Sequence, residues 1–204
     1  MSIPAAARLP RFPFPAWDDS LFVRANGVWH APWLDPVMRA ITLATSNTSF
    51  VIAFWALVCA LLWRRPAARA TWTLCLMAIG MSDLLIDRVL KPLVHRPRPI
   101  EAGLPIRALT DLPRTLGFPS GHASNFAALA MVLTLRRSPW ALPAWVFTLI
   151  VGWSRVYVGV HRPVDVLAGW VFGSMVGVLV GRWLLRLLGW RPRRPAPPET
   201  PPPR

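Results

Sequence analysis

The chain has 204 residues, of which 54% are apolar, and its formal net charge is +14. Its mean hydropathy of +0.40 and its long apolar runs exclude an ordinary soluble domain and predict one helical membrane domain. The charge could suit nucleic acid, but the arginines form short clusters between apolar runs, as they do in membrane loops. We therefore expect the bilayer, and no nucleic acid, as a partner.

Residues 1–40 are predicted to form an N-terminal interfacial segment. Residues 1–18 are rich in proline and aromatic residues and lack the long apolar core of a cleaved signal peptide. Residues 19–40 mix charges with tryptophans, which is typical of an amphipathic segment on a membrane surface. Asp35 and Pro36 are expected to start a helix, with the aspartate as its cap and the proline in its first turn.

Five apolar stretches follow, so residues 41–188 are predicted to be an all-α integral membrane protein domain, a bundle of about five transmembrane helices. Their approximate bounds are 41–63, 70–90, 120–136, 140–158 and 163–188. The TSNTS patch of the first stretch is polar, but its hydroxyls can bond to their own helix backbone. Cys59 and Cys75 lie in separate stretches and are expected to be buried thiols, not a disulfide or a metal site. Residues 189–204 form a tail rich in proline and arginine that should be disordered.

Arginine clusters predict the orientation of the spans. They follow the first stretch, follow the third stretch and occupy the tail, and alternation of spans puts these regions on one side. The positive-inside rule makes that side cytoplasmic. The 91–119 loop and the 154–165 turn then face outward from a bacterial-type inner membrane. The 91–119 loop is also basic, although the rule places it outside. Its charges could serve to bind a ligand, and a count of charges does not distinguish ligand binding from an effect on orientation.

The turn from Ser154 to Asp165, SRVYVGVHRPVD, contains the first group of residues able to do chemistry. His161 and Asp165 are four apart and would share one face of a helix, where a carboxylate fixes the tautomer of an imidazole. Arg155 offers a planar fork that suits phosphate oxygens. This combination indicates a histidine nucleophile for phosphoryl transfer, and the alternative is an interfacial helix start with ordinary polar residues.

The second group is KPLVHRPRP, from Lys91 to Pro99, in which prolines stiffen a turn that holds several basic groups. The alternative is a set of snorkelling side chains at a helix end. Asp83, Asp87 and Lys91 are spaced four apart on one helix face. We expect Asp87 to pair with Lys91 or a nearby arginine, and a structural role for both carboxylates is favoured over a catalytic one.

The third group is GFPSGHASN, from Gly117 to Asn125. Ser120 is expected to cap the next helix, whose first amides, including that of Gly121, are unpaired and suit an anion. His122 would stand beside that anion as a proton donor. The alternative is a capped helix with an incidental histidine. Two histidines beside anion-binding features on one membrane face favour the functional interpretation.

Together the three groups resemble the signature of the type 2 phosphatidic acid phosphatase superfamily. That signature is a lysine and Arg-Pro with six residues between them, then Pro-Ser-Gly-His, then Ser-Arg followed after five residues by His and after three more by Asp. The matching residues are Lys91, Arg98, Pro99, Pro119, Ser120, Gly121, His122, Ser154, Arg155, His161 and Asp165. The resemblance implies a helical bundle whose active site opens at the membrane surface and needs no metal or other cofactor. Many membrane members have six spans, whereas five are predicted here.

The resemblance also implies roles. His161 would attack phosphorus to give a phosphohistidine, Asp165 would hold its reactive tautomer, and His122 would protonate the leaving oxygen and then activate water. The implied phosphate-binding residues are Lys91, Arg98, Ser120, Gly121 and Arg155. Second-tier candidates that flank the motifs are His95, Arg96 and Arg162. Tyr157 is expected to pack or to lie at the interface.

The expected function is that of a metal-independent lipid phosphatase acting on a phosphate or diphosphate monoester, with an isoprenoid diphosphate such as undecaprenyl diphosphate as the favoured substrate. Phosphatidic acid or phosphatidylglycerol phosphate is the alternative within this class. A lipid-phosphate binding or transport protein could use the same basic pocket, but it has no need for His161 with Asp165 and a second histidine. Vanadate-dependent haloperoxidases share the anion pocket but are typically soluble.

Overall fold

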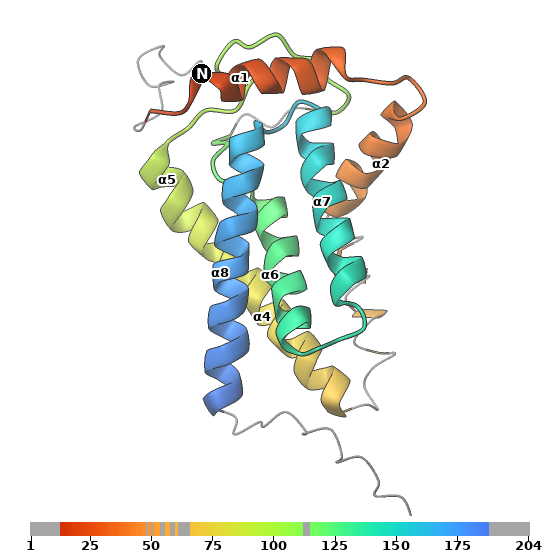
Figure 1. Ribbon diagram of the computed structural model, residues 1–204, viewed down its shortest axis with the longest axis vertical. Coiled ribbons are helices and arrows are strands. Elements are labelled where there is room, and N and C mark those ends of the chain that lie inside the picture. Colours follow the sequence, from red (N-terminus) through yellow and green to blue (C-terminus); the bar gives the residue numbers. More distant parts are fainter. Residues whose placement is uncertain are drawn as a thin grey trace, which may run out of the picture.

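The computed structural model describes residues 13–47, 49, 51–53, 56–57, 60, 66–111 and 115–187. Within these ranges the protein is helical and has no strand, and Pro97 and Leu116 form an isolated bridge. The elements in chain order are α1 (Ala16–Val23), the π-helical turn η2 (Arg24–Val28), α2 (Asp35–Ser46), α4 (Pro66–Leu85), the π-helical turn η3 (Ile86–Leu90), α5 (Lys91–Val94), α6 (Gly121–Leu135), α7 (Ala141–Tyr157) and α8 (Pro163–Leu187). Figure 1 shows α6 between α4, α7 and α8, with α1 across one end of these helices.

The helices agree with the later apolar stretches of the sequence. The bounds of α6, α7 and α8 lie within one residue of those predicted. α4 begins at Pro66 rather than at residue 70. A proline is tolerated in the first turn because the amide hydrogen that it lacks would have no partner within the helix. Cys75 on α4 is a buried free thiol, as expected. The first predicted stretch lies only partly within the described residues, and Cys59 and the tail lie outside them.

Length and apolar character single out one helix. In the part of the chain that the structure describes, the segment Pro163–Arg182 of α8 is the one helix long and apolar enough to cross a membrane by these two criteria. α6 is apolar but shorter. The count of five spans therefore stays a prediction, while the helical class is confirmed.

α6 forms the centre of the bundle. Its alanines Ala123, Ala127, Ala128 and Ala130 have no exposed surface. Glycines of α8 face it closely: a Cβ atom added at Gly169 would lie 2.6 Å from the Ser120 carbonyl oxygen. Small side chains on both helices thus allow their backbones to approach, as is common between helices in membranes.

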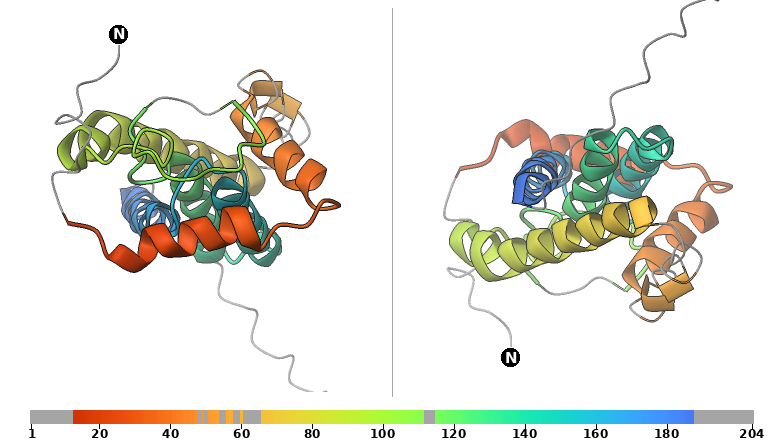
Figure 2. Two further views of the ribbon diagram at one scale, coloured as in Figure 1. Left: turned by 90° about the horizontal axis from the view of Figure 1, so that it is seen from above. Right: turned by 90° about the horizontal axis from the view of Figure 1, so that it is seen from below.

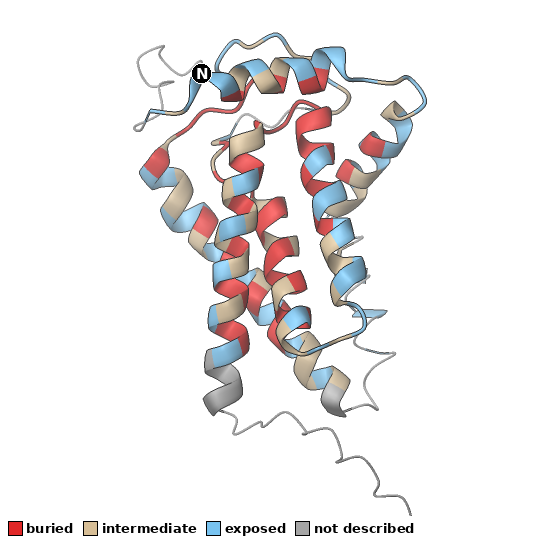
Figure 3. Cartoon of the chain, viewed as in Figure 1, coloured by how far each residue is buried: buried red, intermediate tan, exposed pale blue. Residues whose placement is uncertain are grey.

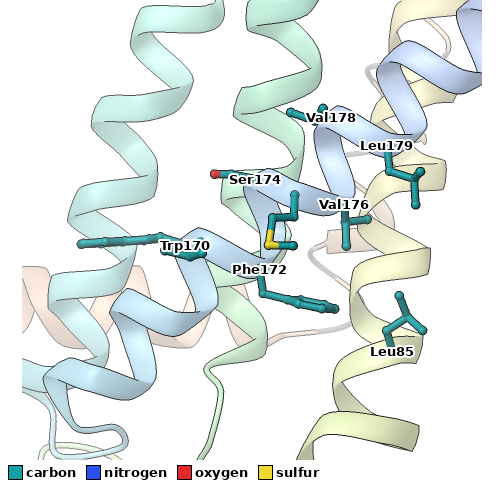
Figure 4. A pocket seen from close by; sticks show the side chains of 9 residues that line it. Leu85, Trp170, Phe172, Ser174, Val176, Val178 and Leu179 are labelled. Carbon is teal, nitrogen blue, oxygen red and sulfur yellow. The ribbon is translucent and has the colours of Figure 1, made fainter.

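The outward faces of the helices carry large apolar side chains. On α8, Val171 and Met175 are each 63% exposed, and Figure 3 shows buried residues concentrated toward the middle of the bundle. A hollow of about 850 Å³ on the outside of α8, beside Leu85 of α4, is lined almost entirely by apolar side chains (Figure 4). These surfaces suit acyl chains rather than water.

The N-terminal segment covers the end of the bundle at which α7 finishes and α8 begins (Figures 1 and 2). Phe22 of α1 and Ala25 of η2 are fully buried against Val156 and Val166. Asp18 is also fully buried. The segment is therefore a packed part of the protein at this end.

α2 departs from expectation at both ends. Asp35 makes no capping hydrogen bond, and instead its carboxylate accepts from the Tyr157 hydroxyl at 2.6 Å and pairs with Arg107 at 2.8 Å. These partners come from α7 and the long loop, so tertiary contacts prevail over the local cap. At the other end α2 stops at Ser46, because Asn47 is extended with ψ at 107°. The first predicted stretch is thus interrupted beside the site described next.

Candidate active site

Four of the eight predicted site residues line one cavity at the α1 end of the bundle. Its volume is about 320 Å³. The four are Arg98, His122, Arg155 and His161. They come from the loop after α5, the start of α6, the end of α7 and the turn before α8. Further lining residues are Thr42, Leu43, Ser46, Thr110, Asp111 and Val160.

His161 lies in the turn between α7 and α8, not on a helix with Asp165 as its spacing suggested. The prediction that the two residues meet is nevertheless correct, since His161 Nδ1 is 3.7 Å from Asp165 Oδ2. That distance is a close contact but is too long for a hydrogen bond. On its other side His161 Nε2 lies 3.3 Å from an Arg98 guanidinium nitrogen. The ring is thus held between a carboxylate and a cation.

Burial sets the protonation state of His161. Its side chain is almost inaccessible, and burial, followed by the positive charges of Arg98, Arg155 and Lys91, holds its pKa well below the ordinary histidine value. The ring is therefore neutral at neutral pH. A neutral imidazole has a free nitrogen lone pair, which nucleophilic attack requires.

Asp165 is fully buried and is fixed by two further groups. Its Oδ1 pairs with Arg96 at 2.6 Å, and its Oδ2 accepts from the Arg162 amide at 2.9 Å. Arg96 also pairs with Asp18 at 2.6 Å, and Asp18 accepts from the Val164 amide of α8. The sequence analysis placed Arg96 among the second-tier site candidates and did not predict a role for Asp18. The sequence showed Asp18 only as a carboxylate in a segment expected to lie at the membrane interface.

Arg98 is anchored by neutral groups. Its Nε donates to the Thr115 hydroxyl at 3.0 Å, and its Nη1 donates to the Val160 carbonyl at 3.2 Å. Burial lowers its pKa to about 10, so it stays cationic at neutral pH. Its charge is available beside His161 for an anion in the cavity.

Arg155 and His122 both contact α2. Arg155 donates to the Ser46 hydroxyl at 3.0 Å and to the Thr45 hydroxyl at 2.7 Å. His122 Nε2 lies 3.1 Å from the Thr45 carbonyl oxygen and 3.5 Å from the Ser46 hydroxyl. Sequence reasoning assigned the hydroxyls of this patch to their own helix and did not predict these contacts.

The remaining four predicted residues do not line the cavity. Ser120 occupies the N-cap position of α6, but its hydroxyl makes no capping bond and has no partner among the described residues. This corrects the expected cap, and the Ser120 amide instead donates to the Asp165 carbonyl at 2.9 Å. Gly121 begins α6. Lys91 pairs with Asp87 at 2.5 Å, which confirms that predicted pair.

Arg98, Arg155 and two histidines line one cavity, and the Asp165 carboxylate lies beside His161. Such a set of cations and acid–base groups suits an anionic ligand. A family model described as the PAP2 superfamily matches residues 72–188, and the chain belongs to this family. In the described residues no three His, Cys, Asp or Glu side chains gather closely enough to hold a metal ion.

Similar proteins are phosphatases by name. A phosphatidylglycerophosphatase B of Bacillus subtilis is 30% identical over 79% of this chain and 81% of its own length. An undecaprenyl-diphosphatase of Sulfolobus acidocaldarius is 36% identical, but the match spans 47% of each chain, about half of that relative. The crystal structure of a transmembrane PAP2 type phosphatidylglycerolphosphate phosphatase from Bacillus subtilis has a TM-score of 0.68 at 28% identity, over 86% of this chain and 88% of that one.

Proposed function

We propose that the protein is an integral membrane phosphatase that hydrolyses a lipid phosphate or diphosphate through a phosphohistidine. The observation that carries this proposal is the neutral, buried His161 held between Asp165 and Arg98 on the wall of a cavity that also contains His122 and Arg155. A binding or transport protein has no need for a nucleophile backed by a carboxylate or for a second histidine.

The proposed reaction has two steps. First, His161 Nε2 attacks the terminal phosphorus, and the bond from this phosphorus to the leaving oxygen breaks. The leaving oxygen stays on the lipid, or on the lipid phosphate when the substrate is a diphosphate, and His122 gives it a proton. Then His122 takes a proton from water, the water oxygen attacks phosphorus, and the bond to His161 breaks to release phosphate. Arg98 and Arg155, with Lys91 nearby, stabilise the charge on the phosphoryl oxygens. The Ser120 hydroxyl, which has no partner among the described residues, and the Gly121 amide add hydrogen bonds to the phosphate.

An isoprenoid diphosphate such as undecaprenyl diphosphate is the proposed substrate, and phosphatidylglycerol phosphate or phosphatidic acid is the alternative. The names of the two relatives described above support one substrate each. The apolar outer faces of α8 and its neighbours support a membrane position in which the lipid tail stays in the bilayer. We place the site on the outer face of a bacterial inner membrane, because the sequence predicts that the arginine clusters after the first and third apolar stretches and in the tail are cytoplasmic.

Phosphate release from these three lipids by the purified protein in detergent tests the proposal. The wild type should release phosphate from at least one of them, with the isoprenoid diphosphate fastest. His161→Ala should abolish release, whereas His30→Ala, which removes an exposed histidine outside the cavity, should not. Turnover at the wild-type rate by folded His161→Ala protein would exclude the mechanism, and tight lipid binding without any release by the wild type would favour the binding protein.

A further inference from the structure

The last turn of α2 lies against the cavity although it belongs to neither the three motifs nor the matched family segment. That segment begins at residue 72, whereas α2 ends at Ser46. The interruption at Asn47 comes one residue later. Irregular backbone within a membrane helix is tolerated where it lines a cavity, and here Thr42 and Ser46 do line one.

Two hydroxyls of this turn have their lone pairs directed at Arg155. The Thr45 hydroxyl donates its hydrogen to the Ile41 carbonyl, and the Ser46 hydroxyl donates its hydrogen to the Thr42 carbonyl. A hydroxyl that has given its only hydrogen to its own helix can still accept. Both accept from Arg155, one from each terminal nitrogen of the fork. The guanidinium plane is therefore set by two points on α2.

The same turn holds His122. A carbonyl oxygen only accepts, so the contact between His122 Nε2 and the Thr45 carbonyl requires a hydrogen on Nε2. The Ser46 hydroxyl is 3.5 Å from the same nitrogen and 3.0 Å from Arg155, so it lies between the two residues. A proton donor and a phosphate-binding cation are thus oriented by adjacent residues of one helix.

The partners that α2 offers to Arg155 are neutral. Over the described ranges no carboxylate forms an ion pair with Arg155, whereas Arg96 and Arg162, which flank the site, pair with aspartates. Neutral acceptors fix the direction of a guanidinium without cancelling its charge. That combination suits a cation that must meet a phosphate in a defined geometry.

We propose that Thr45 and Ser46 are positioning residues that aim Arg155 at the phosphate and fix the ring orientation of His122 beside the cavity. This assignment rests on the proposed phosphatase function. It makes α2 a fourth contributor to the active site, beside the three motif segments.

Four variants and two readouts test this assignment. The variants are Ser46→Ala, Thr45→Val, Ser46→Thr and the control Thr148→Val, whose buried hydroxyl bonds to the Ala144 carbonyl of its own helix. The readouts are kcat and KM for phosphate release and the affinity for vanadate followed by tryptophan fluorescence. Loss of a hydrogen bond to a charged group should lower kcat/KM and vanadate affinity roughly 10- to 100-fold in the first two variants. Ser46→Thr should retain most of both, and the control should match the wild type.

A double-mutant cycle separates positioning from general stability. If Ser46 acts through Arg155, Ser46→Ala should add little to the loss of kcat/KM caused by Arg155→Lys, because lysine has no guanidinium group for Ser46 to orient. Full additivity, or wild-type kinetics and vanadate affinity in Ser46→Ala and Thr45→Val, would overturn the assignment while leaving the phosphatase intact. If the wild type released no phosphate from any lipid, the proposed function would fail. The vanadate affinities of the variants would then decide whether Thr45 and Ser46 position Arg155 for an anion.

Discussion

The buried cations at the site end of the bundle fall into two groups. Arg96 and Arg162 pair with carboxylates, and these pairs join α1 to the start of α8. Arg98 and Arg155 are held by hydroxyl and carbonyl oxygens. The first group has its charge compensated by the protein and serves structure. The second group has neutral partners, so its charge is not cancelled by these contacts, as the proposed phosphate-binding role requires.

Asp18 should matter for both stability and activity. Burial raises its pKa, while the Val164 amide and Arg96 act in the opposite direction. Asp18→Ala leaves Arg96 with one buried partner fewer, and loss of one member of a buried pair costs about 3–5 kcal/mol of unfolding free energy. Thermal unfolding in detergent measures the loss, and kcat should fall because Arg96 also orients Asp165. The control Arg24→Ala removes an exposed charge from the same segment and should leave the unfolding temperature and kcat unchanged.

The pH dependence of His161 should reflect its environment. Because its pKa is lowered, the neutral fraction of His161 persists as pH falls through 6.5 and is lost only well below that value. An NMR titration of the His161 ring should therefore show no protonation between pH 8 and pH 6.5. Arg98→Gln removes the strongest of the nearby positive charges and should raise the pKa of His161. An ordinary histidine titration near pH 6.5 in the wild type would contradict this interpretation.

At the scale of elements, α6 and α8 carry the site because their backbones are close. The Ser120 amide donates to the Asp165 carbonyl, so the start of α6 is bonded to the first turn of α8. Gly169 permits this approach. The start of α6 and the carboxylate behind His161 are thereby placed together.

Gly169→Ala tests this contact. The added Cβ would lie 2.6 Å from the Ser120 carbonyl, which is backbone and cannot turn aside, so the helices must separate. We expect a loss of about 1–3 kcal/mol in unfolding free energy together with reduced phosphate release. Gly80→Ala is the matched control, because its Cβ would meet nothing within 4 Å and should be neutral or slightly stabilising. Equal stability of the two variants would mean that the close approach is unimportant.

In the molecule as a whole, the two ends of the bundle differ in their polar features. The α1 end holds the cavity, the long loop and the paired charges, and the α6–α7 connection lies at the opposite end (Figure 1). α6 joins the two ends with 15 residues, a length of about 22 Å. Lateral surfaces between the ends are apolar. A lipid could therefore keep its tail in the bilayer while its phosphate enters the polar end.

Thiol labelling of intact cells tests the orientation. In a background lacking Cys59 and Cys75, a cysteine replacing exposed Ala102 in the long loop should react with an impermeant reagent added outside. A cysteine replacing Ser138, between α6 and α7, should react only after the cells are opened. Reversed labelling would place the site in the cytoplasm and exclude an externally exposed lipid diphosphate as substrate. Labelling of both positions would mean that α6 does not cross the bilayer.

The local order of helices and motifs along the chain could be predicted from the amino-acid sequence. Apolar runs predicted α6, α7 and α8 to within a residue, and short motifs identified the histidines and arginines of the cavity, because periodicity and motif spacing are properties of neighbouring residues. The tertiary structure alone decided which of these residues meet and what holds them: His161 in a turn rather than on a helix, Asp18 behind Arg96, and Thr45 and Ser46 under Arg155. Arg155 and Ser46 are 109 residues apart, and Arg96 and Asp18 are 78 apart. Contacts over such separations depend on how the helices pack, and no local pattern of residues encodes them.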